Sequence, residues 1–304
     1  MKDRENMDRI QEKRATALMF LASFLWGSSF VASKICLNEG MLPFETVFYR
    51  MLVGVIGIGV IFHRELSRFS PAALRAGLTA GVVTSLIYTA EMYGITMIET
   101  TKASFLTSTN IVMMPFLSAI FLRTHLEPRS FLAAMITICG VALLSLKGTE
   151  RISVSPGDAL LLLAALGYAM SSIVVVRLGT GASATQITFL QLLVTMIYTG
   201  IMTLFQGRGG SYSSSAAGAL LYLAIGPTLI CFLIKNKALQ YLSPLHCTMI
   251  LATEGIFCSV LSVIILHDHV TVRMLFVIAM ILLGILIESN ARQPKREMQQ
   301  RWQP

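Results

Sequence analysis

Long apolar runs separated by short polar connectors dominate the pattern of this chain. Ten of the runs are long enough to cross a bilayer, because a transmembrane helix needs roughly 20 mainly apolar residues. The expected helices lie near residues 15–37, 44–62, 73–95, 103–122, 130–146, 158–177, 185–205, 215–236, 245–266 and 271–288. The connectors carry turn and cap formers such as Asn38, Gly40 and Pro43. The pattern predicts an all-α integral membrane protein with ten transmembrane helices.

The placement of lysine and arginine predicts how these helices are oriented. If the N-terminus is cytoplasmic, seventeen of the 24 basic side chains fall on the cytoplasmic side, five fall outside, and Lys34 and Arg50 remain within helices. Cytoplasmic connectors are enriched in Lys and Arg, so both terminal tails, residues 1–14 and 291–304, are expected in the cytoplasm. We therefore expect a multi-pass protein of a cell inner membrane.

The two halves of the chain resemble each other. A shift of 144 residues aligns His125–Gly140 with His269–Gly284 and also pairs Asn110 with Glu254 and Glu91 with Lys235. The expected repeats are residues 15–148 and 149–290. Each contains five helices, an odd number, so the second repeat is inverted relative to the first. Inverted repeats are common in secondary transporters, which bind substrate near the midplane between the repeats, and we expect a central cavity there.

Composition excludes several other classes of protein. Charged residues make up 13% of the chain and hydrophobic residues 55%, whereas soluble domains are roughly a quarter charged. The net charge of +8 does not indicate nucleic-acid binding, because no base-reading or phosphate-reading element accompanies it. The five cysteines lack metal-ligand spacing. We expect a monomer with no metal, no cofactor and no nucleic-acid partner, in contact with the lipid bilayer.

Five ionisable side chains fall within the expected helices. Such groups cost roughly 2.5–3.5 kcal/mol at the membrane centre and usually face a cavity or a partner. By depth they form an outer group, Lys34, Arg50 and Glu91, and an inner group, Lys235 and Glu254. We expect both groups to act as gating charges. The alternatives are snorkelling for the two lysines and structural ion pairs for the two glutamates.

Polar and aromatic side chains that recur at helical spacing, or at matching places in the two repeats, indicate the lining of the cavity. The expected substrate-binding residues are Trp26, Ser29, Tyr88, Glu91, Asn110, Tyr168, Ser171, Lys235 and Glu254. For any single serine or threonine, a hydrogen bond between helices is the simpler explanation.

Five segments carry a resemblance to a known family. They are WGSSFVASK (Trp26–Lys34), PFETVFYR (Pro43–Arg50), TTKASFLTSTNIVMMP (Thr100–Pro115), GDALLLLAALGYA (Gly157–Ala169) and ALQYLSPLHCTMILATEG (Ala238–Gly255). Over nearly its full length the chain resembles EamA-type transporters of the drug/metabolite transporter superfamily. The resemblance implies ten helices, two inverted repeats, a central cavity and the transport of metabolites such as amino acids, often outward. Two departures are Gly255 after Glu254, where the family often has proline, and Lys235, where an uncharged residue is common.

We therefore expect a secondary transporter that exports small polar metabolites, amino acids or related zwitterions foremost, by alternating access. No phosphate-binding loop of an ATP-driven pump is present. One alternative keeps the fold but carries drugs or lipid-linked sugars. Another is a membrane-embedded enzyme acting on lipid-linked substrates, which would need clustered catalytic groups. The closest cluster, His267–His269, is interpreted as a solvated connector, so we expect no enzymatic activity.

Overall fold

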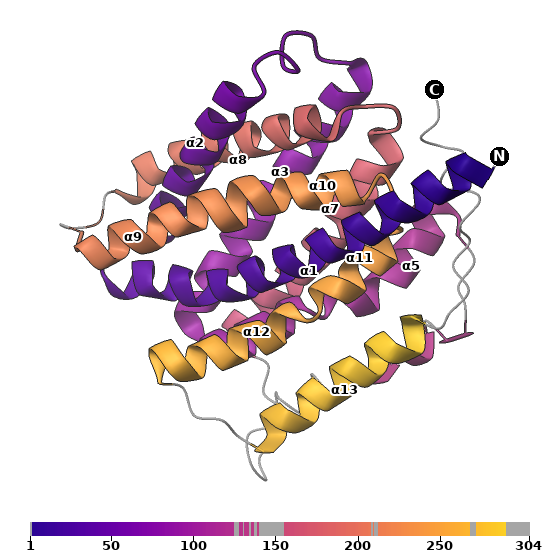
Figure 1. Ribbon diagram of the computed structural model, residues 1–304. Helices are drawn as coiled ribbons and strands as arrows, with labels where there is room; N and C mark the ends of the chain where they lie inside the picture. Colours follow the sequence, from indigo (N-terminus) through magenta and orange to yellow (C-terminus); the bar gives the residue numbers. More distant parts are fainter. Residues whose placement is uncertain are drawn as a thin grey trace.

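The chain folds into a bundle of helices that run roughly parallel to one long axis (Figure 1). The computed structural model describes residues 2–124, 155–207, 209, 212–267 and 272–289, and residues 128, 129, 131–133, 135, 136 and 139. The helices are α1 (Lys2–Asn38), α2 (Pro43–Ile61), α3 (Pro71–Met97), α4 (Thr100–Thr107), α5 (Asn110–Leu122), α7 (Pro156–Leu178), α8 (Ala184–Gln206), α9 (Ser214–Leu223), α10 (Cys231–Ala238), α11 (Pro244–Leu251), α12 (Glu254–Leu261) and α13 (Val272–Ser289). Two π-helical segments, η1 (Ala224–Ile230) and η2 (Ser262–Leu266), follow α9 and α12.

Eight helical stretches in the described residues are long and apolar enough to cross a membrane. They are Arg9–Asn38, Pro43–Ile61, Pro71–Met97, Thr100–Leu122, Pro156–Leu178, Ala184–Gln206, Ser214–Ala238 and Pro244–Leu266. Each corresponds to one of the ten expected helices. Helix α13 lies where the tenth is expected, and the fifth, near 130–146, falls mainly outside the described residues. The chain is thus a multi-pass, all-α membrane protein, and ten helices remain a prediction.

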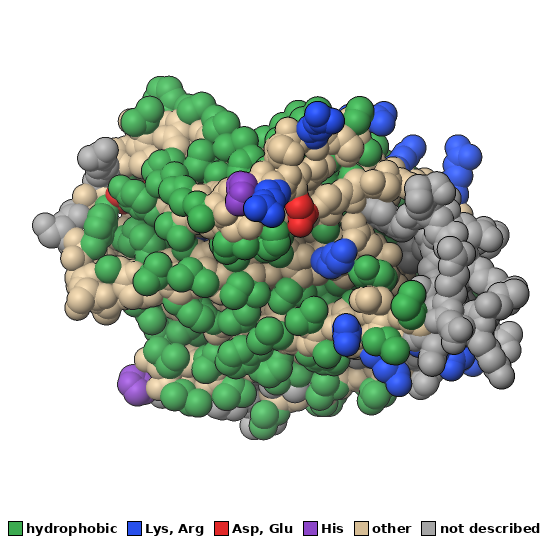
Figure 2. Space-filling model, turned by 45° about the horizontal axis from the view of Figure 1, so that its top comes forward, with side chains coloured by type: hydrophobic (Ala, Val, Ile, Leu, Met, Phe, Trp, Pro, Cys, Tyr) green, Lys and Arg blue, Asp and Glu red, His purple; other side chains and the backbone are tan. Residues whose placement is uncertain are grey.

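The outer faces of the helices are strongly apolar. Large hydrophobic side chains such as Val60, Leu204 and Phe205 are exposed, the last two to more than 80%. Hydrophobic side chains cover the broad middle of the molecule (Figure 2). A surface of this kind is unfavourable in water, and it matches the lipid chains of a bilayer.

Hydrogen bonds between connectors show that consecutive helices alternate in direction. At one end, Gln186 Nε2 donates to the carbonyls of Glu65 and Arg68, both at 2.7 Å. At the other end, Phe44 N donates to Gln206 Oε1 at 3.2 Å. There too, Lys102 of α4 pairs with Asp158 of α7 at 2.6 Å. Helix α7 therefore starts at the end of the bundle opposite to the end where α5 finishes. This arrangement agrees with the expectation of a fifth transmembrane helix between α5 and α7.

The two ends differ in charge. The end that holds connectors 62–70, 179–183 and 239–243, here called the basic end, exposes Arg64, Arg68, Arg75, Arg123, Arg177 and Lys237. In the described residues, the opposite end holds Glu39, Glu45, Glu99, Lys102 and Asp158. In Figure 2 the blue side chains gather toward one side of the molecule. This asymmetry favours a cytoplasmic basic end.

Several helices begin at a proline preceded by a capping serine. Ser70 accepts from Ala73 N, Ser155 from Asp158 N and Ser243 from His246 N, each from the residue three positions on. In every case proline follows the serine at the first helical position. Proline fits there because the first amide of a helix has no intrahelical acceptor. These caps set the helix starts close to the predicted positions.

Glycines allow helix α1 to cross α12 closely. A Cβ on Gly27 would lie 2.4 Å from the carbonyl oxygen of Glu254, and a Cβ on Gly255 would lie 2.8 Å from the ring of Phe105. Both distances are shorter than real contacts. The start of α12 is therefore held between α1 and α4, and this position brings Glu254 to the middle of the bundle.

The basic end should be accessible from the cytoplasm. In a Cys139→Ser background, which removes the exposed cysteine among the described residues, we expect Ser67→Cys to react with a membrane-impermeant maleimide only after cells are permeabilised. Ser214→Cys, at the opposite end, should react in intact cells because its connector is expected to face outside. Reaction of Ser214→Cys only after permeabilisation would overturn the orientation.

Gly27→Ala should destabilise the protein. The added methyl group meets the backbone of α12, so we expect a loss of roughly 1–3 kcal/mol, the usual range for overpacking, seen as a lower melting temperature in detergent. Gly218→Ala is the matched control, because nothing lies within 4 Å of its added Cβ. Equal melting temperatures for both variants would show that α1 and α12 are not tightly packed.

Candidate functional site

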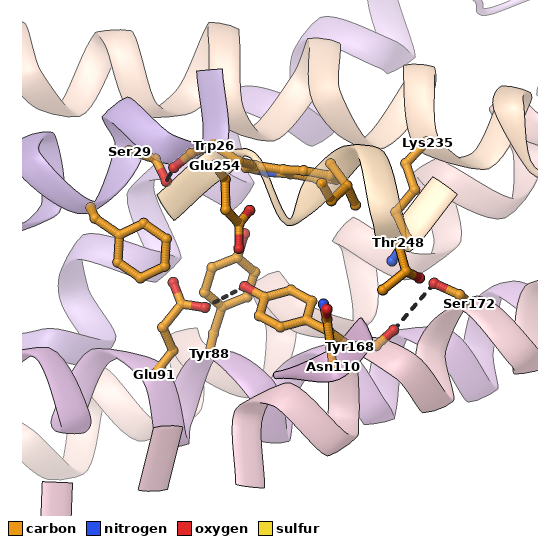
Figure 3. Close-up of a pocket in the computed structure, with 12 residues that line it drawn as sticks. Trp26, Ser29, Tyr88, Glu91, Asn110, Tyr168, Ser172, Lys235, Thr248 and Glu254 are labelled. Atoms are coloured by element: carbon orange, nitrogen blue, oxygen red, sulfur yellow. Dashed lines mark hydrogen bonds between the residues drawn. The ribbon is translucent and has the colours of Figure 1, made fainter. Parts of the chain in front are cut away.

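A pocket lies in the interior of the bundle, between α1, α3, α5, α7, α10, α11 and α12. Its lining consists of Trp26, Ser29, Phe30, Tyr88, Glu91, Asn110, Tyr168, Ser172, Lys235, Thr248, Leu251 and Glu254. Figure 3 shows Glu91 and Glu254 reaching into it from opposite sides, with Lys235 apart from both. The pocket has about 20 Å³ of space for the centres of water-sized molecules, where one bound water needs roughly 10–15 Å³. In this state the pocket has room for little more than one water molecule.

Two interrupted helices bring polar groups to the pocket. Between α4 and α5 the chain turns at Ser108 and Thr109, and between α11 and α12 it turns at Ala252 and Thr253. At both interruptions the backbone makes bonds three residues apart, such as Ile111 N to Ser108 O and Ile256 N to Thr253 O. The interruptions lie 144 residues apart, the shift that aligns the two halves of the sequence.

The first residue after each interruption faces the pocket. Asn110 begins α5 and Glu254 begins α12. Glu254 lies near Thr107 and Ser108 at the other interruption, and Ser23 Oγ is 2.8 Å from Thr253 Oγ1. The two interruptions therefore meet at the pocket, where helix ends supply polar groups that a continuous helix would bond internally.

Asn110 has an unused acceptor. Its side chain is 6% exposed, and its Oδ1 has no hydrogen-bond partner within the described structure. An unbonded buried acceptor costs roughly 1–3 kcal/mol. Because this oxygen belongs to a pocket-lining residue, a ligand that brings an N–H or O–H donor would recover that cost.

The second carboxylate of the pocket, Glu91, is held in place by a side chain of α7. Tyr168 OH donates a hydrogen bond to Glu91 Oε2, and Lys235 Nζ lies 6.0 Å from the centre of the Tyr168 ring. Behind the pocket, the Arg50 guanidinium lies 4.9 Å from the Tyr88 ring, and its Nε donates to Thr228 Oγ1 at 2.8 Å. Cation–π contacts of this kind are favourable when buried.

The pocket charges do not pair with each other in this state. In the described part of the chain, neither Glu91 with Arg50 nor Glu254 with Lys235 comes within ion-pair distance. Glu91 of the expected outer group lines the same pocket as Lys235 and Glu254 of the expected inner group. Lys34 lies outside the lining and donates to Ile95 O at 2.8 Å. The role of these charges in gating stays a prediction.

Aromatic side chains form one wall of the pocket. Trp26 Nε1 donates to Pro227 O at 2.8 Å. This carbonyl belongs to the π-helical segment η1. The Trp26 ring meets Phe232 edge to face, with centroids 5.7 Å apart, and Phe232 also contacts Tyr88 at 6.4 Å. The wall is therefore fixed by polar contacts behind it and offers ring faces and edges to a ligand.

The structure places eight of the nine expected binding residues around this pocket. The exception is Ser171, which instead accepts from Gln191 Nε2 at 3.3 Å in a buried network behind the pocket. Ser172, one residue on, lines the pocket in its place, together with Thr248. Ser172 could have been identified from the sequence, because it follows Tyr168 by four residues and side chains four apart share a helix face.

The buried network that contains Ser171 joins four helices. Gln191 Nε2 also donates to Thr84 Oγ1 at 2.7 Å, and Asn236 Nδ2 donates to Gln191 Oε1 at 3.0 Å and Thr188 Oγ1 at 2.9 Å. These contacts tie α3 and α7 to α8 and α10. They fix Asn236, and with it the direction of the neighbouring Lys235.

Comparison with known sequences identifies the family to which this chain belongs. The sequence profile of the EamA-like transporter family matches residues 13–146 and again residues 155–289. The chain belongs to the EamA-like transporter family. The family match and the transporter relatives below show a membrane transporter, and they indicate a transporter rather than an enzyme.

Two relatives of this EamA-like transporter also span most of its length. An uncharacterized transporter of Archaeoglobus fulgidus is 24% identical over 269 residues, which cover 88% of this chain and 83% of that protein. The uncharacterized transporter YetK of Bacillus subtilis is 24% identical over 249 residues, covering 78% and 73%. A solved crystal structure superposes with a TM-score of 0.73 at 15% identity, covering 91% of this chain and 96% of that one. It supports the fold alone.

Trp26 should report ligand binding. The chain has two tryptophans, so Trp302→Phe leaves Trp26 as the single emitter. Because Trp26 lines the pocket, we expect a bound zwitterion to change its emission in this variant. The paired variant, Trp26→Phe with Trp302 retained, should give no response. A response that survives in Trp26→Phe would place the binding event elsewhere.

Proposed function

We propose that this protein is a secondary transporter of small zwitterionic metabolites, amino acids foremost, and that the pocket is its substrate site. The observation that carries the proposal is the separation of charge within one closed pocket. Glu91 and Glu254 face each other at one end of the pocket and Lys235 lies toward the other end, with Asn110 and Tyr168 between them (Figure 3). A molecule with an ammonium group and a carboxylate would match both ends at once.

Each part of the zwitterion would meet suitable chemistry. The ammonium group would bind Glu254 and Glu91, with Asn110 Oδ1 accepting one of its hydrogens. The carboxylate would bind the Lys235 ammonium. Hydrogen bonds to charged groups contribute roughly 1.5–3 kcal/mol each. The aromatic wall would then pack against the side chain of the substrate.

We further propose that transport proceeds by alternating access between inverted repeats, outward across an inner membrane, as the family resemblance suggests. The matching helix interruptions support an internal repeat, and so do the two successive matches to one family profile. A pocket this narrow would correspond to an occluded state of such a cycle. Opening toward the basic end and the opposite end in turn would give the site access to each side.

A flux assay on proteoliposomes tests the proposal. We expect L-leucine to be carried, whereas its decarboxylated analogue isopentylamine and its deaminated analogue 4-methylpentanoate are carried at least tenfold more slowly, because each lacks one of the two charges. A wider panel of amino acids, drugs and sugars defines side-chain preference. Transport of sugars or apolar drugs with no amino acid flux would refute the zwitterion site.

Glu254→Gln should reduce amino acid flux at least tenfold. The substitution keeps the shape of the side chain but removes the charge that would bind the ammonium group, a loss on the scale of one charged hydrogen bond. Glu39→Gln, an exposed acid between α1 and α2, is the matched control and should transport normally. Equal flux in both variants, at equal amounts in the membrane, would remove Glu254 from the site.

A further inference from the structure

The hydroxyl groups that line the pocket already donate their hydrogens within the protein. Ser29, Ser172 and Thr248 each donate to a backbone carbonyl three or four residues earlier, at 2.6, 3.2 and 2.7 Å. Tyr168 OH donates to Glu91. Since a hydroxyl carries a single hydrogen, these four oxygens offer a ligand hydrogen-bond acceptors and no donor.

Further acceptors lie at the end of the pocket where Glu91 and Glu254 face each other (Figure 3). Between this end and Lys235 lies Asn110, whose buried Oδ1 has no partner in the described part of the chain. Three acceptor groups are thus available to the ammonium group of a substrate. A primary ammonium carries three N–H donors and can satisfy all three groups. Each methyl group on the nitrogen removes one donor, and a trimethylated nitrogen has none.

The aromatic rings do not provide the usual alternative site for a methylated ammonium. Such groups bind in cages of open aromatic faces through cation–π contacts. Here the Arg50 guanidinium lies 4.9 Å from the centre of the Tyr88 ring, and Lys235 Nζ lies 6.0 Å from the centre of the Tyr168 ring. One face of each tyrosine is therefore occupied. A second cation on either ring would lie close to a fixed charge of the same sign, which is unfavourable away from water.

We propose that the pocket selects substrates with a primary ammonium group, and that Asn110 determines this selectivity by accepting the third N–H. The inference rests on the proposed zwitterion site and narrows it to amino acids with an unsubstituted amino group. A substrate without the third N–H would leave Asn110 Oδ1 buried and unbonded, which is unfavourable. Betaines and other quaternary ammonium compounds are therefore excluded as substrates.

The test compares two isomers as competitors of radiolabelled L-leucine flux in proteoliposomes. N-methyl-L-leucine and α-methyl-L-leucine both add one methyl group next to the ammonium centre, but only the first loses an N–H. We expect α-methyl-L-leucine to compete to within about threefold of L-leucine and N-methyl-L-leucine to compete roughly tenfold more weakly, because one buried acceptor stays unpaired. The N,N,N-trimethyl betaine of L-leucine should not compete even at about hundredfold excess, because it offers no donor.

Asn110→Leu should reduce this discrimination. The substitution keeps the approximate size of the side chain and removes the acceptor, so L-leucine should compete more weakly while N-methyl-L-leucine changes little. We expect the tenfold difference between them to fall to about threefold or less. Ser118→Ala is the matched control on the same helix. Its buried hydroxyl also lacks a partner in the described residues, but it lies outside the pocket lining, so the difference should stay at its wild-type value.

The outcomes separate this inference from the proposed function. Equal competition by the two isomers, whether strong or weak, would show that the N–H does not decide and would overturn the inference, as would competition by the betaine. An unchanged difference in Asn110→Leu would remove Asn110 from the role. If Asn110→Leu does not reach the membrane, the isomers still decide on the wild-type protein. Absence of L-leucine flux in the wild type would instead contradict the proposed function.

Discussion

The burial of charge inside a membrane is the constraint on which the rest of this structure depends. Water is not available there to solvate an ionised side chain, so each charge needs a partner supplied by the protein. Aromatic rings supply much of this compensation. Tyr88 lies under Arg50 and Tyr168 under Lys235, and Tyr168 also donates to Glu91. The helices that carry these rings must therefore keep fixed positions around the pocket.

Interrupted helices meet the same constraint for the backbone. The π-helical segment η1 leaves the carbonyl of Pro227 to accept from Trp26 and places Thr228 against Arg50. Proline inside the segment removes one donor and loosens the helix locally. The interruptions before Asn110 and Glu254 likewise expose helix ends to the pocket and not to lipid. Irregular backbone is tolerated at this depth because protein surrounds it.

Much of the architecture could be predicted from sequence because it follows from the solvent. Apolar length predicted the eight spans that the described residues contain, and Ser-Pro pairs marked helix starts. Repeat alignment led to Asn110 and Glu254 as equivalent positions, which both begin half-helices. Near the start of each half a slightly smaller shift pairs Ser29 with Ser171, whereas in the structure Ser172 lines the pocket. The shift that aligns the two halves of the chain identifies an equivalent residue exactly only where the two helices superpose closely.

The sequence by itself determined that the chain is a multi-pass helical membrane protein with two similar halves, because hydrophobic length and the positions of basic residues act locally along each helix. Only the tertiary structure decided that Glu91, Lys235 and Glu254 line one narrow pocket without forming ion pairs with one another in the described part of the chain. The start of α12, which carries Glu254, is fixed at this pocket by close packing against α1 at Gly27 and against α4 at Gly255. Helix rotation and tilt are set by packing between distant segments, and no local pattern in the sequence encodes them.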